Sequence, residues 1–190
     1  MSTVGEPTRR ELLLAATTVP TPADETLRPP SDMELVTGLA GIELLAQFVY
    51  RRALDSGVLT DHVQRLSTQI AAHERAHAQA LSSELARLGG APPGAPTGDG
   101  DAETALAQHH IKVELAALPK QRQWLHLMLE MEDVLERNYH AAIVNLRRPR
   151  LLRLASSIIA SEAQHSAVLG RLLHPGEIDK ALPNAFVNGT

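Results

Sequence analysis

The strongest constraint in this sequence is a pattern of potential metal ligands that occurs twice. Each copy consists of Glu-x6-Tyr followed by Glu-x-x-His, and the two glutamates of a copy are 31 residues apart in the first and 30 in the second. The members are Glu43, Tyr50, Glu74 and His77 in the first copy, and Glu132, Tyr139, Glu162 and His165 in the second. The matched order and spacing indicate an internal repeat.

Helical geometry gives the pattern a chemical meaning. Residues three or seven positions apart lie on one face of an α-helix, so each Glu-x-x-His directs two ligands to one point. The neighbouring positions are apolar, as in Leu39, Ile42 and Leu45, or Ile158, Ile159 and Leu169. The four glutamates are therefore expected to face a core. Buried carboxylates need compensating cations, and two divalent metal ions would supply the charge.

Composition limits the other possibilities. The 190 residues suffice for one domain, and an aromatic content of 3% predicts a core of aliphatic helix seams. Cysteine is absent, so metal ligands must come from His, Asp, Glu or the backbone. A net charge of −4 without a long basic run argues against nucleic acid as a partner. No stretch approaches the length of a transmembrane helix, so stable membrane insertion is not expected.

The pattern of apolar residues, prolines and glycines predicts an all-α chain with four long helices. A capping box at Ser31 and Glu34 predicts the start of the first helix, and Thr60 is expected to cap the second. Pro119 and Pro149 are expected to be the first residues of the third and fourth helices. The predicted helices cover residues 32–55, 61–88, 119–146 and 149–173, with a loop at 90–101 and a shorter helical run at 102–117.

The connection between the second and third long helices carries topological information. If Glu74 and Glu132 lie in one layer of parallel helices, the chain must travel roughly 40 Å back along the bundle, at 1.5 Å per helical residue. The segment 89–118 is long enough for this crossover, whereas antiparallel neighbours need only a short loop. A bundle with a long crossover is therefore predicted.

With one Glu on each of two helices and Glu-x-x-His on the other two, residues 32–173 resemble the ferritin-like superfamily, the di-iron and di-manganese carboxylate four-helix bundles. The sequence is similar to small bacterial ferritin-like domain proteins. The resemblance implies bridging roles for Glu74 and Glu162. The implied terminal ligands are Glu43, Glu132, His77 and His165. Tyr50 and Tyr139 match tyrosines that hydrogen-bond such ligands, and a structural role is favoured over a redox one.

The resemblance implies a function in metal chemistry. Two iron ions reacting with dioxygen or peroxide would make the chain a ferroxidase- or peroxidase-type oxidoreductase, and two manganese ions would make it catalase-like. The alternative is a metal-stabilised structural or stress-related dimerisation bundle without turnover. A homodimer is expected. The sequence departs from rubrerythrins in having no cysteine for a rubredoxin-type site. No fifth short helix of the ferritin cages is evident.

The expected organisation is an N-terminal arm at 1–30, the bundle at 31–174 and a tail at 175–190. Arg9 and Arg10 precede a short apolar run that resembles a twin-arginine export signal, so export is the alternative to a cytoplasmic location. Glu136 could compete with Glu132 as a ligand, but the repeat spacing selects Glu132. The remaining histidines, including His73, are expected on solvated or structural positions.

Overall fold

The computed structural model describes residues 28–177, so the expectations for the twin-arginine motif, most of the arm and most of the tail lie outside the described residues. All regular secondary structure in this part of the chain is helical, which confirms the all-α prediction. Its elements are α1 (Asp32–Asp55), α2 (Asp61–Leu88), α3 (Asp99–Gln108), the 3₁₀ helix η2 (Leu115–Ala117), α4 (Gln121–Ile143) and α5 (Pro149–Leu173).

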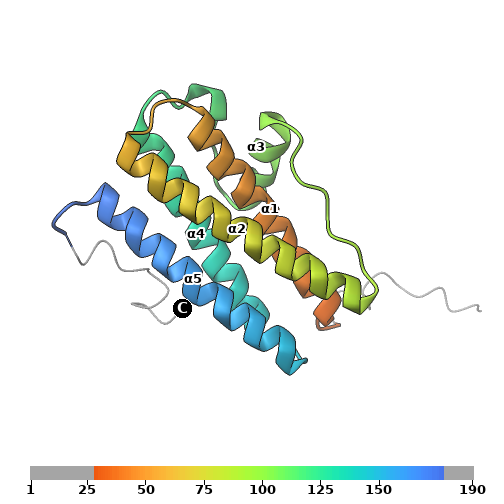
Figure 1. Cartoon of the computed structure of the whole chain (residues 1–190). Helices are drawn as coiled ribbons and strands as arrows, with labels where there is room; N and C mark the ends of the chain where they lie inside the picture. The colour runs from red at the N-terminus through yellow and green to blue at the C-terminus, as the bar shows by residue number, and fades with distance from the viewer. Residues whose placement is uncertain (1–27, 178–190) are drawn as a thin grey trace, which may run out of the picture.

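The four long helices form a bundle in which α1 packs on α2 and α4, and α5 packs on α4 and α2. In Figure 1, α1 and α5 run in one direction and α2 and α4 in the other. The segment after α2 returns along the bundle to α3 and η2 before α4 begins (Figure 1). This is the long crossover that the length of the connection predicts, and it makes α2 and α4 parallel.

Caps define several of the predicted helix ends. The Ser31 hydroxyl accepts from the Glu34 amide at 3.2 Å, and the Ser31 amide donates to the Glu34 carboxylate at 2.7 Å, so the capping box is present. Gly89 ends α2 with a φ of 84°, where a glycine avoids the strain of a left-handed backbone. Pro149 is the first residue of α5, as predicted.

The predicted helical run at 102–117 is wrong. Helix α3 starts earlier, at Asp99, and ends at Gln108. His110 then takes a positive φ of 67°, and the Ile111 amide donates back to the Leu106 carbonyl at 3.0 Å. Helix-ending turns of this kind usually have glycine at the left-handed position. Because this chain has His110 there instead, the sequence does not signal the end of the helix.

The predicted limits of the third long helix are also wrong. Pro119 lies outside α4, which begins at Gln121 with Lys120 as its N-cap and ends at Ile143 rather than at residue 146. The Lys120 amide donates to the Gln123 side chain at 3.1 Å, which fixes the start. Thr60 is the N-cap of α2 without a side-chain cap; its amide instead donates to Gln121 at 2.7 Å.

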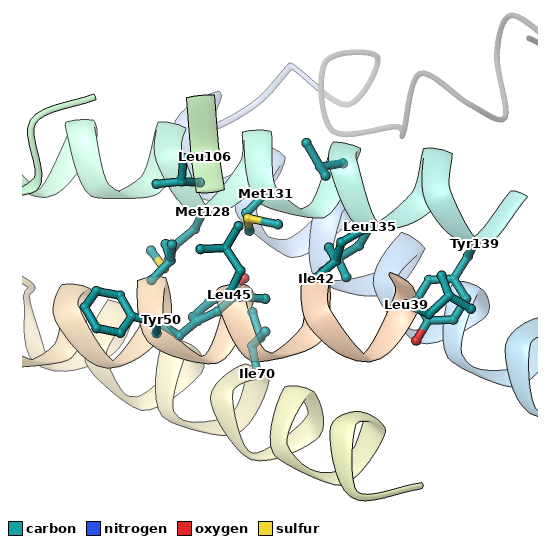
Figure 2. Close-up of a cluster of buried hydrophobic side chains, with 14 of the residues drawn as sticks. Leu39, Ile42, Leu45, Tyr50, Ile70, Leu106, Met128, Met131, Leu135 and Tyr139 are labelled. Carbon is teal, nitrogen blue, oxygen red and sulfur yellow. The ribbon is translucent and has the colours of Figure 1, made fainter. Parts of the chain in front are cut away.

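The core is built mainly from aliphatic side chains, and two methionines and the described aromatic side chains are buried with them. Figure 2 shows buried side chains of α1 and α4 facing one another, among them Leu45, Met128 and Met131. Leu106 adds α3 to the same cluster. A bidentate ion pair between Arg52 and Asp99, at 2.6 and 2.8 Å, ties the start of α3 to the end of α1. The crossover is therefore fixed against the outside of the bundle.

Helix α1 is long and apolar enough to cross a membrane, judged by length and composition, so the expectation that no stretch approaches that length is too strong. Of the apolar window in α1, 56% is buried within the bundle. The helix also presents a carboxylate, Glu43, to the core. Buried core helices pass the same test, and the finding alone does not indicate insertion.

Candidate metal centre

Four carboxylates meet in the centre of the bundle, one from each long helix. Glu43 comes from α1, Glu74 from α2, Glu132 from α4 and Glu162 from α5, and all four are 0% exposed. Each occupies a position on the buried, otherwise mostly apolar face of its helix. A carboxylate without compensation is too costly to bury at such a position, so protons or cations must offset the charge of this centre.

The carboxylates and two histidines form two overlapping groups. Within each group the possible ligand atoms lie within 4.8 Å of one another. The first group is Glu43, Glu74, His77 and Glu162, and the second is Glu74, Glu132, Glu162 and His165. Glu74 and Glu162 belong to both groups. The structure thus brings together all six residues that the repeat selected, in two sets that share two carboxylates.

Each histidine directs its Nδ1 atom into its own group. The Nδ1 of His77 lies 2.8 Å from Glu162 and 3.7 Å from Glu43. The Nδ1 of His165 lies 2.9 Å from Glu162 and 3.0 Å from Glu74. Because Glu162 lies within 3 Å of both nitrogens, it is the carboxylate that connects the two groups most directly.

The two tyrosines bind the outer carboxylates crosswise between α1 and α4. The Tyr50 hydroxyl of α1 donates to Glu132 Oε1 of α4, and the Tyr139 hydroxyl of α4 donates to Glu43 Oε1 of α1. Both rings are fully buried. Each hydroxyl occupies one oxygen of its carboxylate and holds the other toward the cluster. These contacts give both tyrosines a structural role.

The cluster contains many buried polar atoms without a hydrogen-bond partner. Among the described residues, Glu43 Oε2, both oxygens of Glu74, Glu132 Oε2, Glu162 Oε1 and His77 Nδ1 have no such partner. His77 Nδ1 and Glu162 Oε1 are close, at 2.8 Å, but lack hydrogen-bond geometry. Unsatisfied buried polar atoms are rare in folded proteins, and six that converge on one point fit ligands of metal ions. Carboxylate oxygens with imidazole nitrogens suit iron and manganese.

Protons already occupy part of this cluster, and a bound metal ion would have to displace them. Burial raises the pKa of Glu43 and Glu132 well above the usual value, and the charge of Glu74 raises both further. Burial alone would lower the pKa of His77, but the nearby carboxylates of Glu162, Glu43 and Glu74 raise it to about 11. The same balance raises the pKa of His165 to about 12. Burial alone would raise the pKa of Glu162, but both histidines lower it to about 2. Without metal the histidines are therefore protonated at neutral pH.

Sequence reasoning missed one contact of the cluster. His73 lies on an exposed flank of α2, as expected, but its Nδ1 is 2.9 Å from Nε2 of His165. The corresponding position in the second copy is Ser161, so the repeat contains no signal for His73. The competing carboxylate, Glu136, accepts from Ser166 at 2.5 Å and belongs to neither group.

The family comparison agrees with this geometry. A family model described as a ferritin-like domain matches residues 31–175, which is most of the 190-residue chain. A search of the curated proteins gave no match. The match begins at the Ser31 cap of α1 and extends just beyond the end of α5, so it includes the whole bundle and all six residues of the cluster. The chain belongs to the ferritin-like domain family.

Proposed function

We propose that the cluster holds two metal ions, in the first place iron, and that the chain is a ferroxidase- or peroxidase-type oxidoreductase. The observation that carries the proposal is the set of six converging buried ligand atoms without hydrogen-bond partners, divided between two groups that share Glu74 and Glu162. A single ion could not satisfy both groups. Two divalent ions would balance the charge of four carboxylates and leave both histidines neutral.

The geometry supports a specific role for each residue. Glu74 and Glu162 would serve both metal positions, because only they belong to both groups. Glu43 and His77 would complete the first position, and Glu132 and His165 would complete the second. The crosswise hydrogen bonds of the tyrosines are reciprocal between α1 and α4, which supports the interpretation of the sequence pattern as a duplicated helix pair.

Two iron(II) ions at these positions would supply two electrons, which suffices to reduce one peroxide molecule to water when two protons are added. The chain's own residues create the conditions for this chemistry. The tyrosines hold Glu43 and Glu132 in place, and the apolar side chains around them exclude bulk water. Among the six cluster residues, which all lie in the described part of the chain, the histidines alone reach solvent: their side chains are 13% (His77) and 5% (His165) exposed, against 0% for the carboxylates.

The function is tested by loading the metal-free chain with about two equivalents of iron(II) under nitrogen and adding peroxide or air-saturated buffer. We expect about two iron(II) to be lost per peroxide, faster than in an equal concentration of iron(II) without protein. Equal rates with and without protein would refute oxidoreductase activity and leave the metal-stabilised bundle. Release of dioxygen from peroxide by the manganese-loaded chain alone would instead identify a catalase-like enzyme.

A further inference from the structure

The two histidines of the cluster have different outer surroundings. The outer nitrogen of His165, Nε2, lies 2.9 Å from Nδ1 of His73 and 3.4 Å from the Ser161 hydroxyl. The rings of His73 and His165 meet edge to edge at these two nitrogens, with centroids 5.2 Å apart and planes inclined by 23°. No hydrogen bond to the outer nitrogen of His77 occurs among the described residues. Within the described chain, the outer nitrogen of His165 therefore has side-chain partners, and that of His77 has none.

The chemistry of a bound imidazole determines the direction of this hydrogen bond. If Nδ1 of His165 serves as a metal ligand, the ring is neutral and its proton lies on Nε2. Nε2 then donates, and Nδ1 of His73 accepts while Nε2 of His73 carries its own proton. A hydrogen bond of this kind fixes both the tautomer and the rotation of a metal-binding histidine. The usual acceptor is a carboxylate or a carbonyl, and here it is a second histidine.

We propose that His73 is a positioning residue for one of the two metal positions: it accepts a hydrogen bond from Nε2 of His165 and holds Nδ1 of that ring toward Glu74, Glu132 and Glu162. The proposal rests on the two-metal function proposed above. It makes the two positions unequal. The position of His165 binds its ion more tightly than the position of His77, because its imidazole is already oriented before the ion arrives.

The contact also links α2 and α5, the two helices that carry the shared glutamates Glu74 and Glu162. His73 precedes the shared ligand Glu74 on α2, and His165 follows the shared ligand Glu162 on α5. The hydrogen bond therefore spans α2 and α5 on the side of the cluster where its histidines reach solvent. A substitution at His73 changes this outer contact without removing any of the six cluster residues, and because His73 is exposed the bundle should still fold.

The test uses cobalt(II) as the probe, titrated under nitrogen into the metal-free full-length chain and followed by its visible absorption. His73→Phe keeps an aromatic ring and removes the acceptor, whereas His73→Asn keeps an acceptor where Nδ1 lies and removes the ring. His62→Ala changes an exposed histidine on the same helix and serves as the matched control.

We expect the wild-type chain to bind two ions in unequal steps. His73→Phe should weaken one step by about 10- to 100-fold, the usual effect of losing an outer partner of a metal ligand. His73→Asn and the control should stay close to the wild type. Two bound ions with unchanged affinity in His73→Phe, or equal weakening in His73→Phe and His73→Asn, would overturn the positioning role alone. A wild-type chain that binds no cobalt(II) would refute the two-metal function and the positioning role with it.

Discussion

Replacing Glu162 by Gln is expected to abolish tight binding at both metal positions. Glu162 belongs to both groups of ligand atoms and lies within 3 Å of Nδ1 of both His77 and His165. The amide keeps the size of the side chain, but it has no negative charge and only one oxygen to offer. Anaerobic titration with iron(II), followed by counting the retained ions, measures the effect. The iron-dependent reduction of peroxide should disappear in parallel.

Other glutamates provide graded controls for this substitution. Glu43→Gln affects a residue of one group only, so it should remove one of the two ions. Glu130→Gln changes an exposed carboxylate on α4 and should leave two. Circular dichroism of each metal-free variant establishes that the bundle has formed before metal is added. If Glu162→Gln still bound two ions with wild-type affinity, the shared-ligand arrangement would be wrong.

Removal of metal is expected to lower the melting temperature of the bundle by tens of degrees. An ion present at about 1,000 times its dissociation constant stabilises the folded chain by about 4 kcal/mol, so two ions contribute about 8 kcal/mol. For a domain of this size each kcal/mol corresponds to about 2–4 °C, which gives a difference of about 15–30 °C. Differential scanning calorimetry of the iron(II)-loaded and chelator-treated chains, both under nitrogen, measures it.

The physical origin of this large effect is the buried cluster itself. Without metal, the charge of the four carboxylates is offset by protons on His77 and His165 and on Glu43 and Glu132, whose pKa values are raised. Several buried oxygens then lack hydrogen-bond partners. The melting temperature of the Glu162→Gln variant should hardly change when metal is removed, so this variant serves as the control. A wild-type chain that melts at the same temperature with and without chelator would contradict metal binding of any kind.

Most of the fold could be predicted because local chemistry determines it. Ser31 with Glu34, Gly89 and Pro149 fix helix ends through contacts within a few residues, and these ends were predicted correctly. The end of α3 was not, because His110 adopts a backbone conformation that its residue type disfavours. Pro119 was misassigned because the start of α4 depends on the side chain of Gln123, which only the folded turn brings back to Lys120.

The cluster could likewise be predicted only in part: its six ligand residues follow from the repeat, and the contacts between helices do not. Periodicity placed the six residues of the repeat on core-facing stripes, and the fold brings those stripes together. Spacing could not show which tyrosine serves which carboxylate, because each hydrogen bond joins α1 to α4 across 82 or 96 residues. It could not identify His73 either, since that contact depends on how closely α2 approaches α5.

The proposed function requires that this bundle hold two metal ions between its four glutamates and two histidines. The most direct test is to count metal in the full-length chain, purified without chelator, by mass spectrometry calibrated per mole of protein. About two iron or manganese ions per chain would agree with the two groups of ligand atoms that share Glu74 and Glu162. A chain without metal that also takes up none from anaerobic iron(II) would contradict the account.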